Sequence, residues 1–222
     1  MPQKKSSRPS GPGPKHPHEA PRLQQQVRII GGRWKRTPLP VLDAEGLRPT
    51  PDRVRETVFN WLTHLIDGHW EGMRCLDLFA GTGALGFEAA SRGAGKVLMI
   101  EAHTPAVRQL EATRSKLQAG EIEILRGDAV LTLQSLMKRE AADRFDLIFL
   151  DPPYHEGWLP KMLPLCRQMM KDDGYLYAES ESALEDSPAD AGWRGEWEIV
   201  RSDRSGIVFY HVLRPTIAMR EL

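Results

Sequence analysis

The strongest constraint on the fold of this chain is a glycine-rich loop between two apolar segments, within residues 74–101. Residues 75–79 are mostly apolar, which is typical of a strand buried on both faces of a parallel sheet. The loop Gly81-Thr82-Gly83 leads into apolar residues at helical spacing, and residues 96–100 form a second strand pattern that ends on Glu101. The segment therefore predicts one βαβ unit, with a ligand site where the glycines and the start of the helix leave backbone N–H groups free.

The glycines alone do not identify the ligand. The spacing of Gly81, Gly83 and Gly86 also fits the fingerprint of dinucleotide-binding proteins. Asp77, however, lies four residues before Gly81, at the end of the first strand. An acid at this place suits a cofactor with a cationic amino group and would repel a pyrophosphate. We therefore favour a cofactor with a cationic amino group, and a nicotinamide dinucleotide remains the alternative.

These residues resemble the first two motifs of the class I methyltransferases that use S-adenosylmethionine. The resemblance implies that Asp77 and the glycine loop hold the methionine portion, and that Glu101 binds the ribose hydroxyls. It also implies that Asp128, after a third strand at residues 121–125, reads the adenine amine, although a helix cap explains this Asp equally well. The cofactor-binding set is then Asp77, Phe79, Ala80, Gly81, Thr82, Gly83, Glu101, Asp128 and Ala129.

The second chemical motif is Asp151-Pro152-Pro153-Tyr154, which follows the apolar segment 145–150. Open α/β sheets bind their ligands at the carboxyl ends of such strands. The two prolines fix the backbone and remove two N–H donors, so the loop becomes a rigid set of hydrogen-bond acceptors. Acceptors that hold the N–H bonds of an exocyclic base amine can aim its lone pair and stabilise the charge that develops during transfer. Tyr154 offers a ring for stacking a displaced base.

This tetrapeptide resembles the (Asp/Asn)-Pro-Pro-(Tyr/Phe) motif of amino-methyltransferases, which act on adenine, cytosine, guanine or glutamine amide nitrogens. The resemblance assigns the catalytic role to Asp151, Pro152, Pro153 and Tyr154.

The N-terminal part is basic. Residues 1–26 contain six prolines and five Lys or Arg against one Glu, which predicts a tail that does not order itself. Residues 27–41 read as a hairpin about Gly31-Gly32, and a helix follows with Thr50 as its cap and Pro51 at its first position. From Arg22 to Arg55 there are eight Arg or Lys against three acids.

This local positive charge beside a cofactor site predicts an arm that binds nucleic acid. The alternative is a solvated hairpin with Trp34 packed on the core. The expected RNA-binding residues are Arg28, Arg33, Trp34, Lys35, Arg36, Arg48, Arg53 and Arg55.

Several N-terminal motifs make the resemblance closer. Arg-Ile-Ile-Gly-Gly at residues 28–32, Arg-Pro-Thr at 48–50, Arg-Val-Arg-Glu at 53–56 and the glycine loop resemble the ribosomal RNA small-subunit methyltransferase D family. Residues 35–38 depart from the denser basic run that this family commonly carries. The resemblance implies methyl transfer to the N2 amine of one guanine, guanine 966, in 16S rRNA of the small ribosomal subunit or its assembly intermediate.

Other functions remain open at this point. An amino-methyltransferase could act on another RNA or DNA base or on a protein glutamine, and a nicotinamide-dependent dehydrogenase would share the glycine loop. A non-catalytic ribosome-assembly factor would bind the particle and transfer nothing.

The strand patterns predict an α/β fold of the Rossmann-like class I methyltransferase type. Further strands at residues 175–179, 197–200 and 207–213 complete a seven-stranded, mostly parallel sheet with an antiparallel edge. We divide the 222 residues into a tail (1–26), an RNA-binding arm of hairpin and helix (27–72) and a methyltransferase domain (73–222).

Net charge, apolar runs and cysteine spacing give no indication of a membrane span or a zinc site. The formal net charge is zero, and no apolar run is long enough to span a membrane. Cys75 and Cys166 have no paired spacing, and there is no Cys/His cluster of the zinc type. We expect a cytoplasmic monomer that uses no metal.

Overall fold

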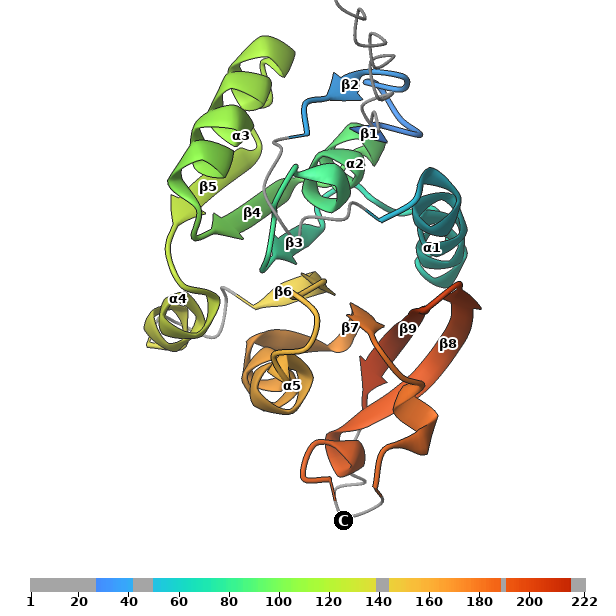
Figure 1. Ribbon diagram of the computed structural model, residues 1–222. Coiled ribbons are helices and arrows are strands. Elements are labelled where there is room, and N and C mark those ends of the chain that lie inside the picture. The colour runs from blue at the N-terminus through green and yellow to red at the C-terminus, as the bar shows by residue number, and fades with distance from the viewer. Residues whose placement is uncertain (1–26, 42–49, 139–143, 189–190, 217–222) are drawn as a thin grey trace, which may run out of the picture.

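A seven-stranded sheet forms the centre of the computed structural model, which describes residues 27–41, 50–138, 144–188 and 191–216. The strand order is β5-β4-β3-β6-β7-β9-β8 (Figure 1). The strands are parallel from β5 to β7, and β9 runs antiparallel to both β7 and β8. The bounds are β3 Arg74–Asp77, β4 Lys96–Glu101, β5 Ile122–Arg126, β6 Phe145–Leu150, β7 Met170–Ser180, β8 Trp197–Ser205 and β9 Val208–Pro215. The predicted fold class is confirmed.

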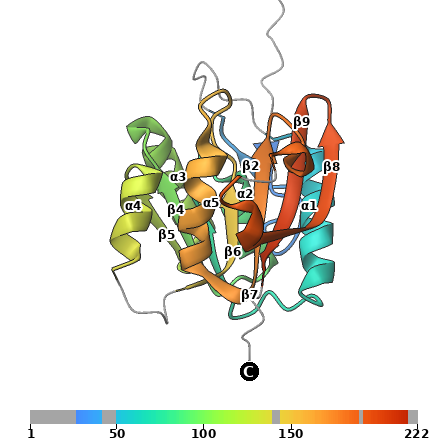
Figure 2. The ribbon, with the colours of Figure 1, turned by 90° about the horizontal axis from the view of Figure 1, so that it is seen from below.

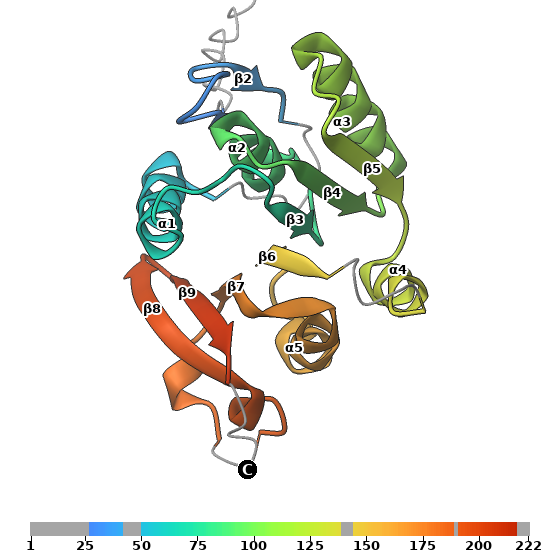
Figure 3. The ribbon, with the colours of Figure 1, turned by 180° about the vertical axis from the view of Figure 1, so that it is seen from behind.

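Helices cover both faces of the sheet (Figures 1 and 2). One face carries α1 (Asp52–Leu65), α2 (Ala84–Arg92) and α3 (Thr104–Leu117), and the other carries α4 (Ala129–Leu136) and α5 (Trp158–Met169). The view from behind shows the same two layers (Figure 3). The sheet is thus the middle of a three-layer structure.

The central strands are apolar at nearly every position because each side of the sheet is buried. In β6, Leu147 and Phe149 belong to the core under α1 and α2, whereas Ile148 and Leu150 belong to the core under α4 and α5. Successive side chains of a strand point to opposite faces, so a strand buried on both sides must be apolar without alternation.

The N-terminal arm is wider than a tight hairpin. β1 (Val27–Arg28) pairs antiparallel with β2 (Pro38–Leu39), and residues 29–37 connect them. The predicted hairpin is therefore present, with a connection longer than the Gly31-Gly32 pair. These glycines instead allow the arm to lie against α2, because a Cβ added to Gly32 would lie 1.9 Å from the Ser91 carbonyl oxygen.

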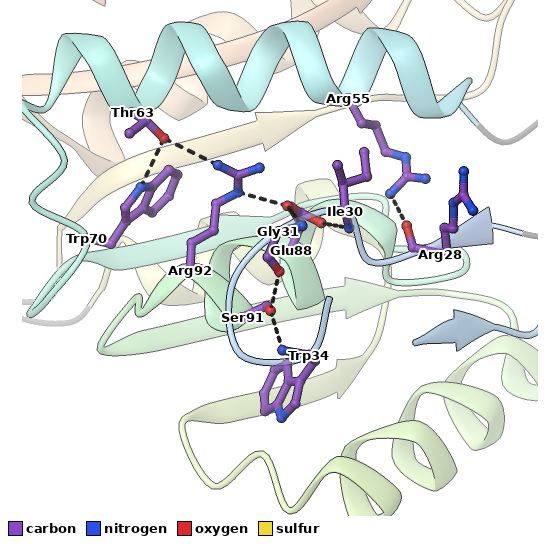
Figure 4. Close-up of polar contacts among 10 residues, drawn as sticks. All are labelled: Arg28, Ile30, Gly31, Trp34, Arg55, Thr63, Trp70, Glu88, Ser91 and Arg92. Atoms are coloured by element: carbon purple, nitrogen blue, oxygen red, sulfur yellow. Dashed lines mark hydrogen bonds and ion pairs between the residues drawn. The ribbon is translucent and has the colours of Figure 1, made fainter. Parts of the chain in front are cut away.

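A buried carboxylate fastens the arm to α2 (Figure 4). Glu88 has a relative exposure of 0%, and its oxygens accept the backbone N–H groups of Ile30 at 2.6 Å and Gly31 at 2.8 Å. Arg92 donates to the same carboxylate at 2.8 Å. Ser91 adds a second fastening, since its Oγ accepts from Trp34 N at 2.9 Å. The arm is therefore joined to the helix that follows the glycine loop.

No described helix is long and apolar enough to cross a membrane, and the described His, Cys, Asp and Glu form no group of three or more arranged for a metal ion. Cys75 and Cys166 are both free and buried.

Replacing Gly32 by Ala should lower the free energy of unfolding by about 1–3 kcal/mol more than replacing Gly68 by Ala. Both glycines have a positive φ, 71° and 75°, so the two variants share the cost of a left-handed Ala. Only Gly32 has the Ser91 carbonyl in the way, since no heavy atom lies within 4 Å of a Cβ added to Gly68. Urea denaturation of both variants measures the difference. Equal losses of unfolding free energy in the two variants would show that the arm shifts to accommodate the added methyl group without an energetic cost.

Candidate active site

The two chemical motifs meet at one edge of the sheet. Asp77 is the last residue of β3, and in the parallel pairing of β3 with β6 it lies opposite Phe149. Asp151 follows β6 directly, so both acids lie at the carboxyl ends of neighbouring strands. This is the edge at which open α/β sheets bind their ligands.

Asp77 is a buried acid beside the glycine loop. Its relative exposure is 2%, and its Oδ2 accepts the N–H of Gly86 at 3.1 Å. The pKa of Asp77 is raised to about 7, mainly by burial and also by the charge of Glu101, while backbone hydrogen bonds from Gly86 and Phe79 oppose the rise. A carboxyl group in this state gains its charge readily when a cation arrives beside it.

Glu101 holds the glycine loop in place. Its Oε2 accepts the N–H of Gly81 at 2.8 Å, and its Oε1 accepts that of His103 at 2.7 Å. Gly83 has a φ of 78°, and a Cβ there would lie 2.5 Å from Phe87. The loop is thus shaped by glycine and tied to the end of β4.

The hydrogen-bond acceptors at this edge fit S-adenosylmethionine. Asp77 can accept hydrogen bonds from the methionine ammonium group, and each Glu101 oxygen keeps a lone pair for a ribose hydroxyl. Gly127 N donates to the Glu101 carbonyl oxygen at 3.0 Å, which brings the loop of Asp128 alongside.

Asp128 caps a helix. Its Oδ1 accepts the N–H of Leu131 at 2.9 Å, at the start of α4. The cap interpretation is therefore confirmed, and a contact of the exposed Asp128 side chain with adenine stays a prediction, as does a role for the buried Ala129.

Asp151 belongs to a cluster of hydroxyl and carboxyl groups. The Thr50 hydroxyl oxygen lies 3.2 Å from Asp151 Oδ2 and 2.7 Å from Glu179 Oε1. Glu179, with a relative exposure of 3%, also accepts from the hydroxyls of Tyr177 at 2.7 Å and Tyr154 at 3.1 Å. One carboxyl group directly after β6 and one from β7 thus contact the same hydroxyl.

Asp151 and Glu179 differ in how well their surroundings tolerate negative charge. Burial raises the pKa of Asp151 well above its usual range, and the charge of Glu179 raises it further. Burial also raises the pKa of Glu179, but hydrogen bonds from Thr50, Tyr177 and Tyr154 oppose that rise. Negative charge is therefore better tolerated on Glu179 than on Asp151.

Sequence reasoning missed the role of three of these residues. Thr50 does not cap α1, because the cap position is Pro51 and carries no side-chain hydrogen bond. Glu179 and Tyr177 lie in the buried carboxyl-terminal part of β7, and a Glu at that end of the strand was the available signal.

The proline loop borders a cavity. Pro152 is buried, whereas Pro153 is exposed and Tyr154 is partly exposed. A cavity of about 180 Å³ lies beside them, and its lining includes Pro152, Tyr154, Trp158, Glu179 and Glu181. Trp158 also contacts Phe79 edge to face, with 5.3 Å between ring centroids. The cavity therefore joins the proline loop to β7 and α5.

Arg55 has a structural role. Its side chain has a relative exposure of 0%, and its Nη2 lies 2.6 Å from Asp52 Oδ1. Its Nη1 donates to the Arg28 carbonyl oxygen at 2.9 Å (Figure 4). Burial lowers the pKa of its guanidinium, and the charge of Asp52 opposes that shift. The prediction that Arg55 contacts RNA is corrected, because its donors are used inside the protein.

The other basic residues of the arm divide between two edges of the sheet. Arg28 pairs with Asp52 at 2.9 Å, and Arg53 donates to Ser205 Oγ at 2.7 Å, both beside Thr50 and the active-site edge. Arg204 of β8 lies next to them, with its guanidinium 5.4 Å from the ring centroid of Phe209. Sequence reasoning did not single out Arg204, whose proximity depends on the pairing of β8 with β9.

Arg33 and Trp34 lie at the opposite edge. Arg33 N donates to the Ser91 carbonyl at the end of α2, and its side chain pairs with Glu121, directly before β5. Its guanidinium also lies 4.1 Å from the Trp34 ring centroid. Lys35 and Arg36 are exposed near this turn, and Arg48 falls outside the described residues. The arm thus does not present all its predicted RNA-binding residues on one surface.

Comparisons with known proteins show the family of the chain. A family model described as "Conserved hypothetical protein 95" matches residues 27–214. The ribosomal RNA small subunit methyltransferase D of Escherichia coli K12 is 37% identical over 191 residues, which are 84% of this chain and 89% of that protein. The protein of that name from Haemophilus influenzae is 36% identical over 198 residues, 87% of this chain and 96% of its own length.

Solved structures show the same fold. A putative methyltransferase, yhhF, from Escherichia coli has a TM-score of 0.69 at 36% identity and covers 86% of this chain and 98% of its own. A putative methyltransferase complexed with SAH has a TM-score of 0.58 at 14% identity, covers 70% of this chain and 48% of its own, and is similar in fold alone. By sequence and by fold, the chain therefore belongs to the ribosomal RNA small subunit methyltransferase D family.

Proposed function

We propose that this protein transfers a methyl group from S-adenosylmethionine to the exocyclic N2 amine of a guanine in 16S rRNA. The observation that supports this most directly is that Asp77 and the Asp151 loop lie at the ends of two paired strands. Cofactor and amine would then meet between them. Guanine 966 is the target that the family resemblance implies, and the substrate is the small subunit or its assembly intermediate.

Asp77 and Glu101 would hold the cofactor, with the backbone of the Phe79–Gly83 segment around it. When bound, S-adenosylmethionine supplies an electrophilic methyl group on a cationic sulfur. The buried Asp77 carboxylate attracts the ammonium group, and Glu101 orients the ribose while it keeps its hydrogen bond to Gly81. Thr82 and the loop backbone complete the enclosure.

Cofactor affinity should fall about tenfold per pH unit as the pH drops below about 7, because neutral Asp77 gives up its attraction for the ammonium group. The sign follows from a raised carboxyl pKa, which leaves Asp77 protonated in the free protein on the acid side of that value. Isothermal titration across this pH range measures the slope. Asp77→Asn should bind more weakly and without this pH dependence, and identical slopes in both proteins would contradict the assignment.

Asp151 and the carbonyl of Pro152 would hold the N–H bonds of the guanine amine. The lone pair of this nitrogen is delocalised into the ring, so acceptors that draw it out of the ring plane make it a better nucleophile. They also stabilise the positive charge that develops during transfer. Tyr154 borders the cavity and would stack on the displaced base, while the two prolines keep the loop rigid.

Asp151→Ala should reduce kcat by about 10²–10³-fold, since one well-placed partner of a developing charge contributes about 2.7–4 kcal/mol. Cofactor binding should be retained, because the cofactor lies on the side of Asp77. Methyl transfer to undermethylated small subunits and isothermal titration measure the two quantities. Asp173→Ala, an exposed acid near the start of β7, is the matched control and should be fully active. Normal turnover of Asp151→Ala would refute the role given to Asp151.

The basic residues at the active-site edge would bind the phosphates near the target. Arg28, Arg53 and Arg204 lie beside Thr50 and the end of β7, so their charge would be available to RNA next to a displaced base. Lys35 and Arg36, with Arg33 and Trp34, would reach only RNA that extends to the opposite edge of the sheet.

Substituting Arg53 and Arg204 by Gln should weaken binding to a short target hairpin and reduce the slope of log K against log salt by about 0.7–0.9 per lost phosphate contact. The variant Lys35→Gln/Arg36→Gln should leave the hairpin slope unchanged and reduce the slope only for the small subunit, where the RNA is long enough. Filter binding over a salt series measures both. If Arg53 and Arg204 left both slopes unchanged, that edge would not be the RNA surface.

Nucleoside mass spectrometry separates the proposal from its alternatives. rRNA from cells that lack the protein should lose one methylated guanine, and the purified protein should restore it. Methylation of another base, of DNA or of a glutamine would identify a different amino-methyltransferase. Binding to the particle without any methyl transfer would indicate an assembly factor.

A further inference from the structure

The cluster of Thr50, Asp151 and Glu179 has too few hydroxyl protons for two charged carboxylates. Thr50 carries one hydroxyl proton and contacts both carboxyl groups, at 2.7 Å and 3.2 Å. If both groups were ionised, one of these contacts would bring two oxygen acceptors together without a proton between them. At least one carboxyl proton must therefore be present for both contacts to be attractive.

Two arrangements satisfy every contact with one shared proton. In the first, Asp151 is the acid and donates to Thr50, which donates to a Glu179 carboxylate. In the second, Glu179 is the acid and donates to Thr50, which donates to an Asp151 carboxylate. The two differ only by the shift of protons along the chain of three groups. The hydroxyls of Tyr177 and Tyr154, at 2.7 Å and 3.1 Å from Glu179, stabilise the charge on Glu179 and so favour the first arrangement at rest.

We propose, on the basis of the methyl transfer inferred above, that Glu179 is the final acceptor of the amine proton, which reaches it from Asp151 through the Thr50 hydroxyl. Glu179 acts through other groups and is a positioning residue, whereas Asp151 touches the amine. The function of the Arg-Pro-Thr motif is then to supply Thr50 as the link.

The proton and electron count of this step is balanced. As the guanine nitrogen bonds the methyl carbon, the carbon–sulfur bond breaks and sulfur keeps its electron pair. The nitrogen then loses one proton to Asp151 Oδ1, the proton on Asp151 Oδ2 passes to Thr50, and the Thr50 proton passes to Glu179. Asp151 ends as the neutral acid it was, and the single negative charge of Glu179 cancels the single positive charge that entered with the cofactor.

Charged groups on neighbouring elements also act on the proton relay formed by Asp151, Thr50 and Glu179. Asp77 of β3 acts on Asp151, Glu181 acts on Tyr154, and the buried Arg55 of α1 acts on Tyr177. Glu179 and Tyr154 also line the cavity of about 180 Å³, so the proton held by Glu179 has a path to solvent after product leaves.

Glu179→Gln should lower the single-turnover rate of methyl transfer by about 10²-fold, the lower bound for a general-base contribution. Wild-type protein should show a rate that rises with pH as Glu179 ionises and then levels off, and the variant should lose this rise. The affinity for S-adenosylmethionine should be unchanged, because the residues that would hold the cofactor are Asp77 and Glu101. A wild-type rate and pH profile in Glu179→Gln would overturn the proposal.

Thr50 provides the matched pair of variants. Thr50→Ser keeps the hydroxyl and should keep the rate and the pH profile, whereas Thr50→Val keeps the shape and should lose both as Glu179→Gln does. This pair tests the relay even if Glu179→Gln does not fold, which thermal melting would reveal. Equal rates and equal pH profiles in Thr50→Ser and Thr50→Val would refute the relay.

Infrared difference spectroscopy on the cofactor-free protein tests the resting state without any turnover. Because Asp77 is also partly protonated near pH 7, the measurement is made in an Asp77→Asn background. There the carbonyl band of a protonated carboxyl should be present at neutral pH, should disappear when Asp151→Asn is added, and should persist when Glu179→Gln is added. A band that disappears in neither variant would contradict the shared proton. If wild-type protein methylated no nucleobase at all, the proposed function would fail instead, so the two failures are distinguishable.

Discussion

The parallel pairing of β3 with β6 is the constraint on which the site depends. It sets Asp77 opposite Phe149 and brings the residue after each strand to one edge, where the glycine loop and the proline loop face each other. Both strands contribute apolar side chains to the two cores, one on each face of the sheet. A shift in the register of β3 against β6 would move these side chains out of the positions that they fill in the cores. The hydrophobic core therefore fixes the distance between the glycine loop and the proline loop.

The site gathers buried acids where most proteins would avoid them. Asp77, Asp151 and Glu179 lie within reach of one another's charges, and burial raises the pKa of each. Carboxyl groups in such surroundings are costly in the free protein and become favourable when cations arrive. A cationic cofactor and an amine that becomes positive during reaction are ligands of the kind that such a site favours.

The sequence was sufficient for the fold and for the residues that belong to local motifs. Strands such as β6 are apolar at every core position, and Asp77, Glu101 and Asp151 each end a strand, so their common edge followed from the topology. Long-range contacts were not accessible in this way. The burial of Arg55, the pairing of Arg33 with Glu121 and the joining of Thr50 to Glu179 each link segments that no periodicity connects. Arginine in particular looks alike in sequence whether it binds a phosphate or a backbone carbonyl.

Because Glu88 fastens the arm to α2, moving the arm would cost free energy. Swinging the arm away would leave Ile30 and Gly31 without their acceptor and Glu88 with Arg92 as its described side-chain partner in an apolar setting, at a cost of several kcal/mol. The arm and the glycine loop are thus held together before any substrate binds. On the proposed function, extrusion of the target nucleotide then falls to the RNA, so the ease with which that RNA opens would govern how readily it is modified.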